Sequence, residues 1–301
     1  MKLWKNKEPS IGLAIAGGGC KAFFALGVAE SFRREGFHFS AVSATSAGTA
    51  MGIAVINQKA DEAVDYFCEL TARNPSNFNL KRLLSGENPF PHEQMYRETI
   101  AKIIDIKTFK KNKVSLAFNA LSMPYYDSIE EKKWRRKLFF QLFAAYRKEI
   151  REANGGRFYP YMYDVARNFA LKEVIFTEDD FFDARKIEDI VLATSSAPPV
   201  VMTQRRDEVL YLDGGIIDNL PVRLLPDVDL TIAIYYQPST RRILEYHNRQ
   251  QSRNILWIHP DGKLPVTVWD YTNPDGVRKA YELGLEAGEN HIRLLRQFVK
   301  K

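Results

Sequence analysis

The sequence has few cysteines and no long apolar run. Its 301 residues include only Cys20 and Cys68, which excludes a disulfide framework and the usual cysteine-rich zinc sites. No apolar stretch approaches the roughly 20 residues that span a bilayer. The apolar stretch at 11–16, after a basic start, is shorter than the core of a secretory signal. These absences predict a cytoplasmic chain with reduced thiols, no signal peptide and no transmembrane segment.

The composition is that of an ordinary globular protein. Hydrophobic residues make up 45% and charged residues 27%, so the chain can bury a core. The net charge of +6 allows contact with anionic lipid or nucleic acid but requires neither. Because no repeat, low-complexity tract or linker interrupts the chain, the simplest prediction is a single domain over 1–301.

A strand, a turn and a helix follow one another twice at the start of the chain. Apolar runs at 11–16 and 39–45 are typical of buried strands, and helix-like spacing follows each, over 21–35 and up to 56. This alternation predicts an α/β fold with a mostly parallel sheet. Further helices are expected at 61–72, 92–106, 130–151, 187–196 and 274–299, and further strands at 114–121, 209–212, 230–236 and 254–259.

The first turn carries the glycine-rich stretch GGGCKA at 17–22. Consecutive glycines let the backbone approach a ligand closely, and the N–H groups that begin a helix favour an anion. A Walker A loop is a poor match because Ala22 follows Lys21. A dinucleotide site matches as G-x-G-x-x-A but lacks the acidic residue expected after the second strand. An oxyanion hole and a plain tight turn are the other interpretations.

The second turn carries Ser46 within the stretch ATSAG at 44–48. A serine between a strand and a helix, with small neighbours, is the setting of a nucleophile elbow, whose pattern is G-x-S-x-G. Here Ala44 replaces the first glycine and Gly48 matches the second. The alternative is a serine that only caps the helix.

Asp213 follows the apolar strand at 209–212 and precedes Gly214 and Gly215. A carboxylate at the end of a parallel strand lies at the edge where α/β sites form, although an Asp-Gly turn is the plain alternative. None of the histidines sits in a triad-like setting, so a serine activated directly by a carboxylate fits the residues better. They are His38, His92, His247, His259 and His291.

Together these three motifs, in this order, resemble the patatin-like phospholipase family of acyl hydrolases, over about 11–236. The resemblance implies a three-layer α/β/α fold with a mostly parallel central sheet, and a dyad of Ser46 as nucleophile and Asp213 as general base. It implies no cofactor and no metal. The oxyanion hole would be formed by Gly17, Gly18, Gly19 and Cys20. The remaining motif positions are Lys21, Ala22, Ala44, Gly48, Gly214 and Gly215.

The positive charge is concentrated at 130–151, which contains eight basic and three acidic residues. This segment nets +5 and leaves +1 for the rest of the chain. Basic residues flanking aromatic ones suit a helix on an anionic membrane surface, and the alternative is a half-buried helix with a solvated basic face. No nucleic-acid-binding motif accompanies the charge. The candidate membrane residues are Lys132, Lys133, Trp134, Arg135 and Arg136.

These observations predict a serine-dependent lipid acyl hydrolase that acts on a phospholipid or another acyl-ester lipid. Two alternatives from other classes stay open. One is a non-catalytic lipid-binding or regulatory protein on the same fold, and the other is a dinucleotide-dependent oxidoreductase that uses the glycine loop. The sequence does not determine the lipid headgroup, the acyl position or the oligomeric state.

Overall fold

The computed structural model describes residues 9–79, 89–124, 129–157, 159–197, 204–206, 209–237, 240–241, 244–245 and 254–299. Within these residues, eight strands form one sheet in the order β5-β6-β3-β2-β1-β7-β8, with β4 also paired to β3. The strands are β1 Ile11–Ile15, β2 Ala41–Thr45, β3 Ser115–Pro124, β4 Lys172–Phe176, β5 Gln204–Arg206, β6 Val209–Asp213, β7 Leu230–Ile234 and β8 Ile255–Ile258.

Helices connect and cover these strands. The α-helices are α1 Ala22–Arg34, α2 Ala47–Ile56, α3 Ala60–Arg73, α5 His92–Ile103, α6 Ile106–Lys111, α7 Ile129–Asn154, α8 Tyr161–Asn168, α9 Ala184–Thr194 and α11 Pro274–Val299. The short 3₁₀ turns are η1 Gly19–Lys21, η2 Glu178–Asp180, η3 Gly214–Ile216 and η4 Val222–Leu224. No helix among the described residues is long and apolar enough to cross a membrane, and the cytoplasmic location stays a prediction.

The middle of the sheet is parallel and buried on both faces. β1 pairs in parallel with β2 and β7, and the parallel set extends to β3 and β8. Every residue of β1, β2 and β7 is buried, which is why these strands read as continuous apolar runs. The other strands, β4, β5 and β6, pair antiparallel. The predicted α/β fold with a mostly parallel sheet is confirmed.

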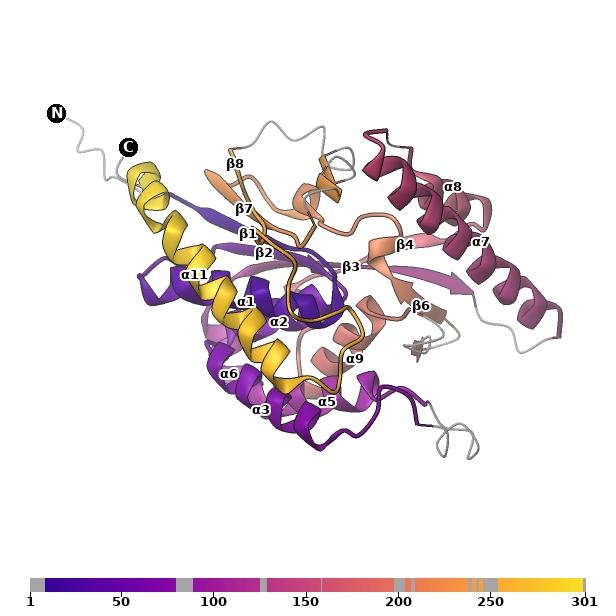
Figure 1. Cartoon of the computed structure of the whole chain (residues 1–301), viewed down its shortest axis with the longest axis horizontal. Coiled ribbons are helices and arrows are strands. Elements are labelled where there is room, and N and C mark those ends of the chain that lie inside the picture. The colour runs from indigo at the N-terminus through magenta and orange to yellow at the C-terminus, as the bar shows by residue number, and fades with distance from the viewer. Residues whose placement is uncertain are drawn as a thin grey trace.

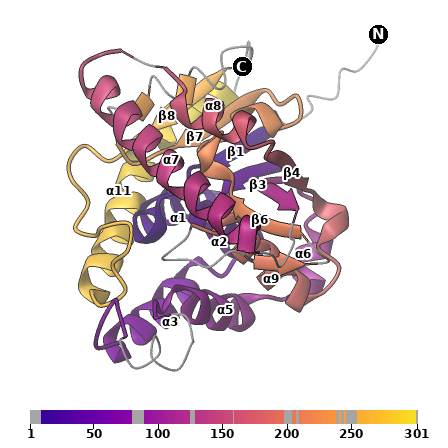
Figure 2. The same cartoon turned by 90° about the vertical axis from the view of Figure 1, so that its right-hand side faces the viewer.

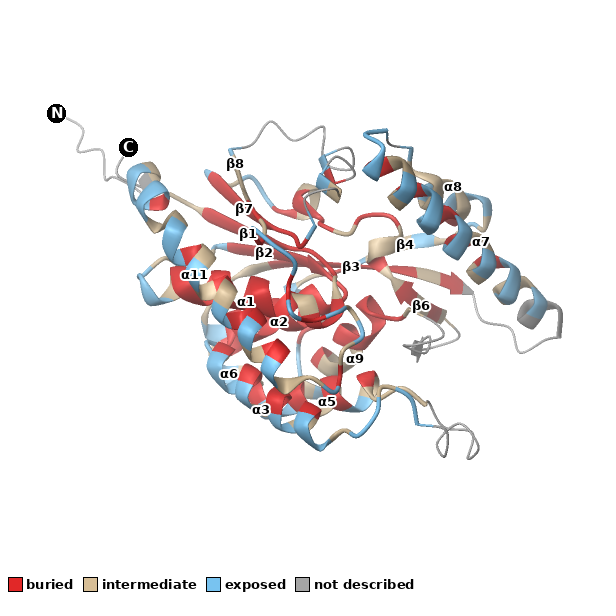
Figure 3. Cartoon of the chain, in the orientation of Figure 1, coloured by how far each residue is buried: buried red, intermediate tan, exposed pale blue. Residues whose placement is uncertain are grey.

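Helices flank the sheet on both sides (Figure 1). α1, α2 and α11 lie together with α3, α5 and α9 on one side, whereas α7 and α8 lie on the other. In Figure 2, α7 runs across the end of β3 and β6. There Leu138 and Leu142 of α7 are buried in one apolar cluster with Leu121 and Leu212. The burial colours show the centre of the sheet as the core of the protein (Figure 3).

Glycines bring α1 and α11 into close contact. A Cβ atom at Gly284 of α11 would lie 2.1 Å from the Phe24 carbonyl oxygen of α1, and one at Gly27 would lie 2.1 Å from the Tyr281 carbonyl oxygen. Any larger residue at these positions would push the helices apart. The C-terminal helix is therefore packed closely against the helix that follows the glycine loop.

The expected helices and strands agree with the structure in most places. The long basic helix forms over Ile129–Asn154, while the helix expected at 92–106 ends earlier, as α5 at His92–Ile103. Two strands, β4 and β5, and two helices, α6 and α8, were not predicted. The loop expected at 74–91 lies partly outside the described residues, and the single-domain organisation stays a prediction.

Candidate active site

Ser46 sits in a strained turn between β2 and α2. Its φ and ψ angles are 54° and −134°, a conformation that costs a non-glycine residue about 1–3 kcal/mol. Although Ser46 is the N-cap residue of α2, its side chain makes no capping hydrogen bond. The hydroxyl is therefore not used as a helix cap, and Ser46 lines a cavity.

Small neighbours make this turn fit the sheet. A Cβ atom at Gly48 would lie 2.7 Å from the Ile15 carbonyl oxygen and 2.8 Å from that of Ala16, so glycine lets α2 start close against β1. Ala44, at the position where the elbow pattern has glycine, is fully buried in β2 and paired with Ile15 and Phe118. Its methyl group is accommodated within the core.

Asp213 reaches Ser46 by a different route from the one predicted. The prediction that Asp213 ends a parallel strand is wrong, because β6 pairs antiparallel with β3. β3 runs on past the end of β2, so that Thr45 pairs with Asn119 and Asp213 pairs with the next residue, Ala120. The last residue of β6 is thus brought beside the turn at Ser46.

The two side chains interact directly. The Ser46 side chain lies beside the Asp213 carboxylate, near enough to lower its pKa, and the Gly215 N–H donates a hydrogen bond to the carboxylate at 2.7 Å. Burial raises the pKa of Asp213 to about 6, and these two contacts oppose the rise. The Asp213 N–H donates to the Ser196 carbonyl at 2.8 Å, which fixes the strand end.

The glycine loop lies against the elbow and against the C-terminal part of the chain. A Cβ atom at Gly17 would lie 2.8 Å from the Ser46 Cβ, and one at Gly18 would lie 2.6 Å from the Tyr236 ring. Gly19 has a φ of 55°, and a Cβ there would lie 1.9 Å from the Val268 carbonyl oxygen. A side chain at any of these three positions would clash with a neighbouring residue, so each requires glycine.

The backbone N–H groups of this loop divide into two sets. Gly17 donates to the Asn219 carbonyl and Cys20 to the Val268 carbonyl, each at 3.1 Å. Among the described residues, the N–H groups of Gly18 and Gly19 have no such partner. Of the four expected oxyanion donors, Gly17 and Cys20 are therefore engaged in holding the loop. The Cys20 side chain is buried, which raises the pKa of its thiol to about 12.

Residues after Asp213 hold the two loops together. The Asn219 side chain donates to the Gly17 carbonyl at 3.1 Å, and buried Asn119 donates to the carbonyls of Gly214 and Asp218. Arg223 pairs with Asp218 at 2.8 Å and also with Glu173. The Asp-Gly-Gly turn is thus connected to the glycine loop, to β3 and to β4.

A cavity of about 320 Å³ opens at the dyad. One wall consists of the glycine loop with Lys21, whose pKa is lowered by burial and by nearby Lys263. The facing wall comes from α7 and α8. The lining residues used below are Ser46, Asp213, Gly18, Gly19, Tyr146, Glu149, Met162 and Trp269.

No histidine among the described residues lines the cavity at Ser46 and Asp213. His92 is buried behind the site, in hydrogen-bond contact with Tyr271 and, at 3.4 Å, with Ser195, and burial lowers its pKa to about 3. His259 bonds the adjacent Pro260 carbonyl, and neither histidine lines the dyad cavity. His247 lies outside the described residues.

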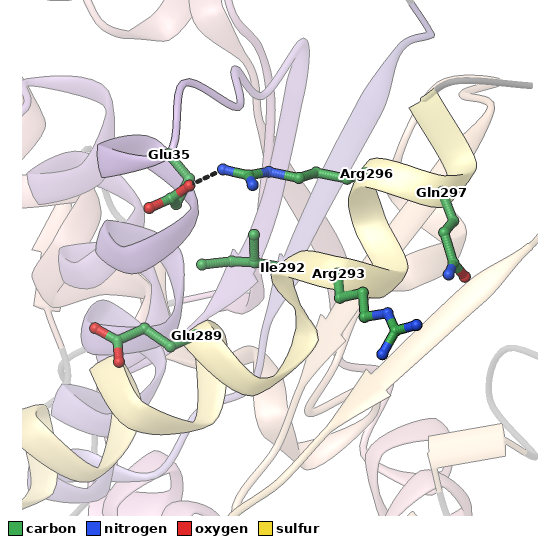
Figure 4. Close-up of a pocket in the computed structure, with 6 residues that line it drawn as sticks. All are labelled: Glu35, Glu289, Ile292, Arg293, Arg296 and Gln297. Carbon is green, nitrogen blue, oxygen red and sulfur yellow. Dashed lines mark hydrogen bonds and ion pairs between the residues drawn. The ribbon is translucent and has the colours of Figure 1, made fainter.

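A second hollow, of about 590 Å³, lies at the C-terminal end of α1, away from Ser46. Figure 4 shows its side chains, which come from α11 and from Glu35, and Arg296 reaches across to form an ion pair with Glu35. The hollow contains no serine, cysteine or histidine among its lining residues. Its chemistry does not match that of the dyad cavity.

Comparison with known proteins agrees with this geometry. The sequence profile described as "Patatin-like phospholipase" matches residues 13–226. The chain belongs to the patatin-like phospholipase family. No curated protein sequence matches this patatin-like chain.

Two solved structures resemble this patatin-like phospholipase. VipD from Legionella pneumophila has a TM-score of 0.44 and 12% identity, covering 94% of this chain and 67% of VipD. Human GIVD cytosolic phospholipase A2 has a TM-score of 0.46 and 10% identity, covering all of this chain and 64% of the human one.

Several site residues of this patatin-like chain were missed by sequence reasoning. Val268 and Trp269, on the segment before α11, line the cavity beyond the matched family region. Glu149, taken only as a charge within the basic helix, is buried in the cavity wall. Asn219 lies in the polar turn DNLP that follows Asp213, where the sequence predicts turn residues that support the loop but not their contact with Gly17. The others have no local sequence pattern.

Proposed function

We propose that this protein hydrolyses the acyl ester bond of a lipid, with Ser46 as nucleophile and Asp213 as general base. The observation that supports this most strongly is the contact between a strained, cavity-lining serine and a half-buried carboxylate whose pKa is raised. Membership of the patatin-like phospholipase family supports lipid as the substrate class.

The chemistry follows from the positions of these groups. The Ser46 oxygen attacks the ester carbonyl while Asp213 takes its proton, and the N–H groups of Gly18 and Gly19 stabilise the negative oxygen that forms. The carbon–oxygen bond then breaks, and the proton held by Asp213 passes to the leaving alcohol. Water, deprotonated by Asp213, attacks the acyl-serine, the bond to the Ser46 oxygen breaks, and the proton passes from Asp213 to Ser46 as the fatty acid is released. A carboxylate with a pKa of about 6 is a better base near neutral pH than an ordinary aspartate.

The substrate would be reached at an anionic membrane surface through α7. Of the residues predicted for membrane contact, Lys133 and Arg136 are exposed, whereas Trp134 is half-buried against Phe169. Arg135 is half-buried, and the Lys132 side chain lies outside the described residues.

The outer face of α7 has more exposed aromatic and basic side chains than the residues predicted for membrane contact. Phe140 is 72% and Phe143 62% exposed, and cations surround them. Over 133–154 no exposed side chain is acidic. Exposed aromatic rings among cations suit the interface of an anionic bilayer, and this helix also lines the dyad cavity. The exposed cations are Lys133, Arg136, Lys137, Arg147, Lys148 and Arg151.

Labelling and kinetics with active-site variants test this function. A fluorophosphonate probe should label Ser46, and Ser46→Ala should lose both labelling and the hydrolysis of a short acyl ester, by about 10³-fold or more. The exposed Ser76→Ala is the matched control. Full hydrolysis by Ser46→Ala would contradict the assignment. Lipid binding without labelling or hydrolysis would favour the non-catalytic alternative.

The dinucleotide alternative has its own test. The loop that would hold a pyrophosphate faces Ser46 and Tyr236, and β2 ends in Thr45 without an acidic residue for a ribose. A thermal shift on addition of a nicotinamide dinucleotide, absent in a variant with an altered glycine loop, would reinstate that alternative. We expect no shift.

A further inference from the structure

The cavity at the dyad has a buried carboxylate that the ester chemistry does not use. Glu149 lies on α7 and is 7% exposed. One of its oxygens accepts a hydrogen bond from the Met162 N–H of α8 at 2.7 Å. No basic side chain among the described residues forms an ion pair with it. Burial without a counter-charge raises the pKa of Glu149 to about 7.

Capping of α8 explains only part of this arrangement. Met162 lies in the first turn of α8, where a side-chain acceptor satisfies a free backbone N–H. A neutral glutamine oxygen would accept the same bond. Burying an acidic side chain without a cation is unfavourable, and the cap does not require it, so its presence in the cavity wall points to a cationic ligand.

Two aromatic side chains line the same cavity. Tyr146 is one helical turn before Glu149, and burial together with the nearby Glu149 carboxylate raises the pKa of its hydroxyl. Trp269 lines the cavity from the segment before α11. Aromatic faces beside a carboxylate attract organic cations, above all ammonium groups. A metal ion fits less well, because no cluster of three acidic, histidine or cysteine ligands occurs among the described residues.

We propose that Glu149, with Tyr146 and Trp269, forms a subsite for the ammonium group of a cationic or zwitterionic lipid headgroup. This rests on the proposed function in one respect: the headgroup occupies the subsite while its ester lies at Ser46. Choline and ethanolamine share this chemistry. The carboxylate is then neutralised by the substrate rather than by the protein.

Binding to the uncleavable Ser46→Ala protein tests the subsite without relying on catalysis. The ligands are ether lysolipids with the same alkyl chain, below their micelle concentration, bearing phosphocholine, phosphoethanolamine or phosphoglycerol. We expect phosphocholine to bind more tightly than phosphoglycerol, and Glu149→Gln to reduce this preference about tenfold. The phosphoethanolamine ligand distinguishes a quaternary from a primary ammonium.

A matched control is provided by Glu152→Gln on the same helix. Glu152 accepts a bond from the Tyr161 hydroxyl at 2.9 Å but does not line the cavity, so the headgroup preference should stay at its original value. If Glu149→Gln weakens all three ligands by the same factor, or if phosphocholine is never preferred, the subsite is wrong. Failure of the proposed function would appear differently, as ester hydrolysis that survives Ser46→Ala.

Discussion

Replacing Asp213 by asparagine should stabilise the protein while removing its proposed general base. The pKa of Asp213 is raised from 3.8 to about 6 by burial, whereas in the unfolded chain it is about 3.9. The native state therefore binds more protons than the unfolded state between pH 4 and 6, and ionised Asp213 destabilises it above pH 6. Two pKa units correspond to about 3 kcal/mol.

Asparagine has no charge to bury, and its oxygen can still accept from Ser46 and from the Gly215 N–H. The variant should exceed the wild type in unfolding free energy by about 3 kcal/mol at pH 8, and the gain should vanish as the pH falls to about 4. Urea unfolding followed by circular dichroism at several pH values measures this. Asp227→Asn is the control, because Asp227 is exposed.

The result that refutes this reasoning is a stability gain that does not depend on pH, or a variant less stable than the wild type at pH 8. Either would mean that the Asp213 carboxylate is not desolvated in the native state. Asp213 would then be no better a base near neutral pH than an ordinary aspartate, since its raised pKa depends on the same burial.

Other measurements address the turn, the base and the helix. Ester hydrolysis should fall as the pH drops through about 6, because protonated Asp213 cannot accept the Ser46 proton. Ser46→Gly should be about 1 kcal/mol more stable than Ser46→Ala in thermal unfolding, because glycine relieves the positive φ. The double substitution Phe140→Ala and Arg147→Glu should weaken cosedimentation with anionic vesicles. Unchanged binding would mean that the basic face of α7 is only solvated and does not bind a membrane.

The residues that the sequence could identify are those with a local pattern. Ser46 and the glycines at 17–19 each lie in a turn directly after a buried apolar strand, and both features are visible in a short window. Asp213 was predicted for the same reason, although the antiparallel direction of its strand was not predicted. An antiparallel pairing depends on how β3 extends beyond β2, which no local spacing reveals.

The remaining site residues depend on contacts between distant parts of the chain. The role of Glu149 depends on which face of α7 packs inward. The basic composition of that helix indicates only its outer face. β4 was missed because it is a short, half-exposed strand at Lys172–Phe176, and such strands lack the apolar run that marks β1 and β2. α8 is too short for a clear helical period.

The hydrogen bond from the Cys20 N–H to the Val268 carbonyl joins the glycine loop to a segment outside the matched family region. The family match ends at residue 226, yet the backbone that presents Gly18 and Gly19 is held by a segment well beyond it. A fragment cut at that boundary would retain Ser46 and Asp213 but lose the carbonyl that holds the Cys20 N–H. It would also lose β7, the parallel neighbour of β1 in the middle of the sheet.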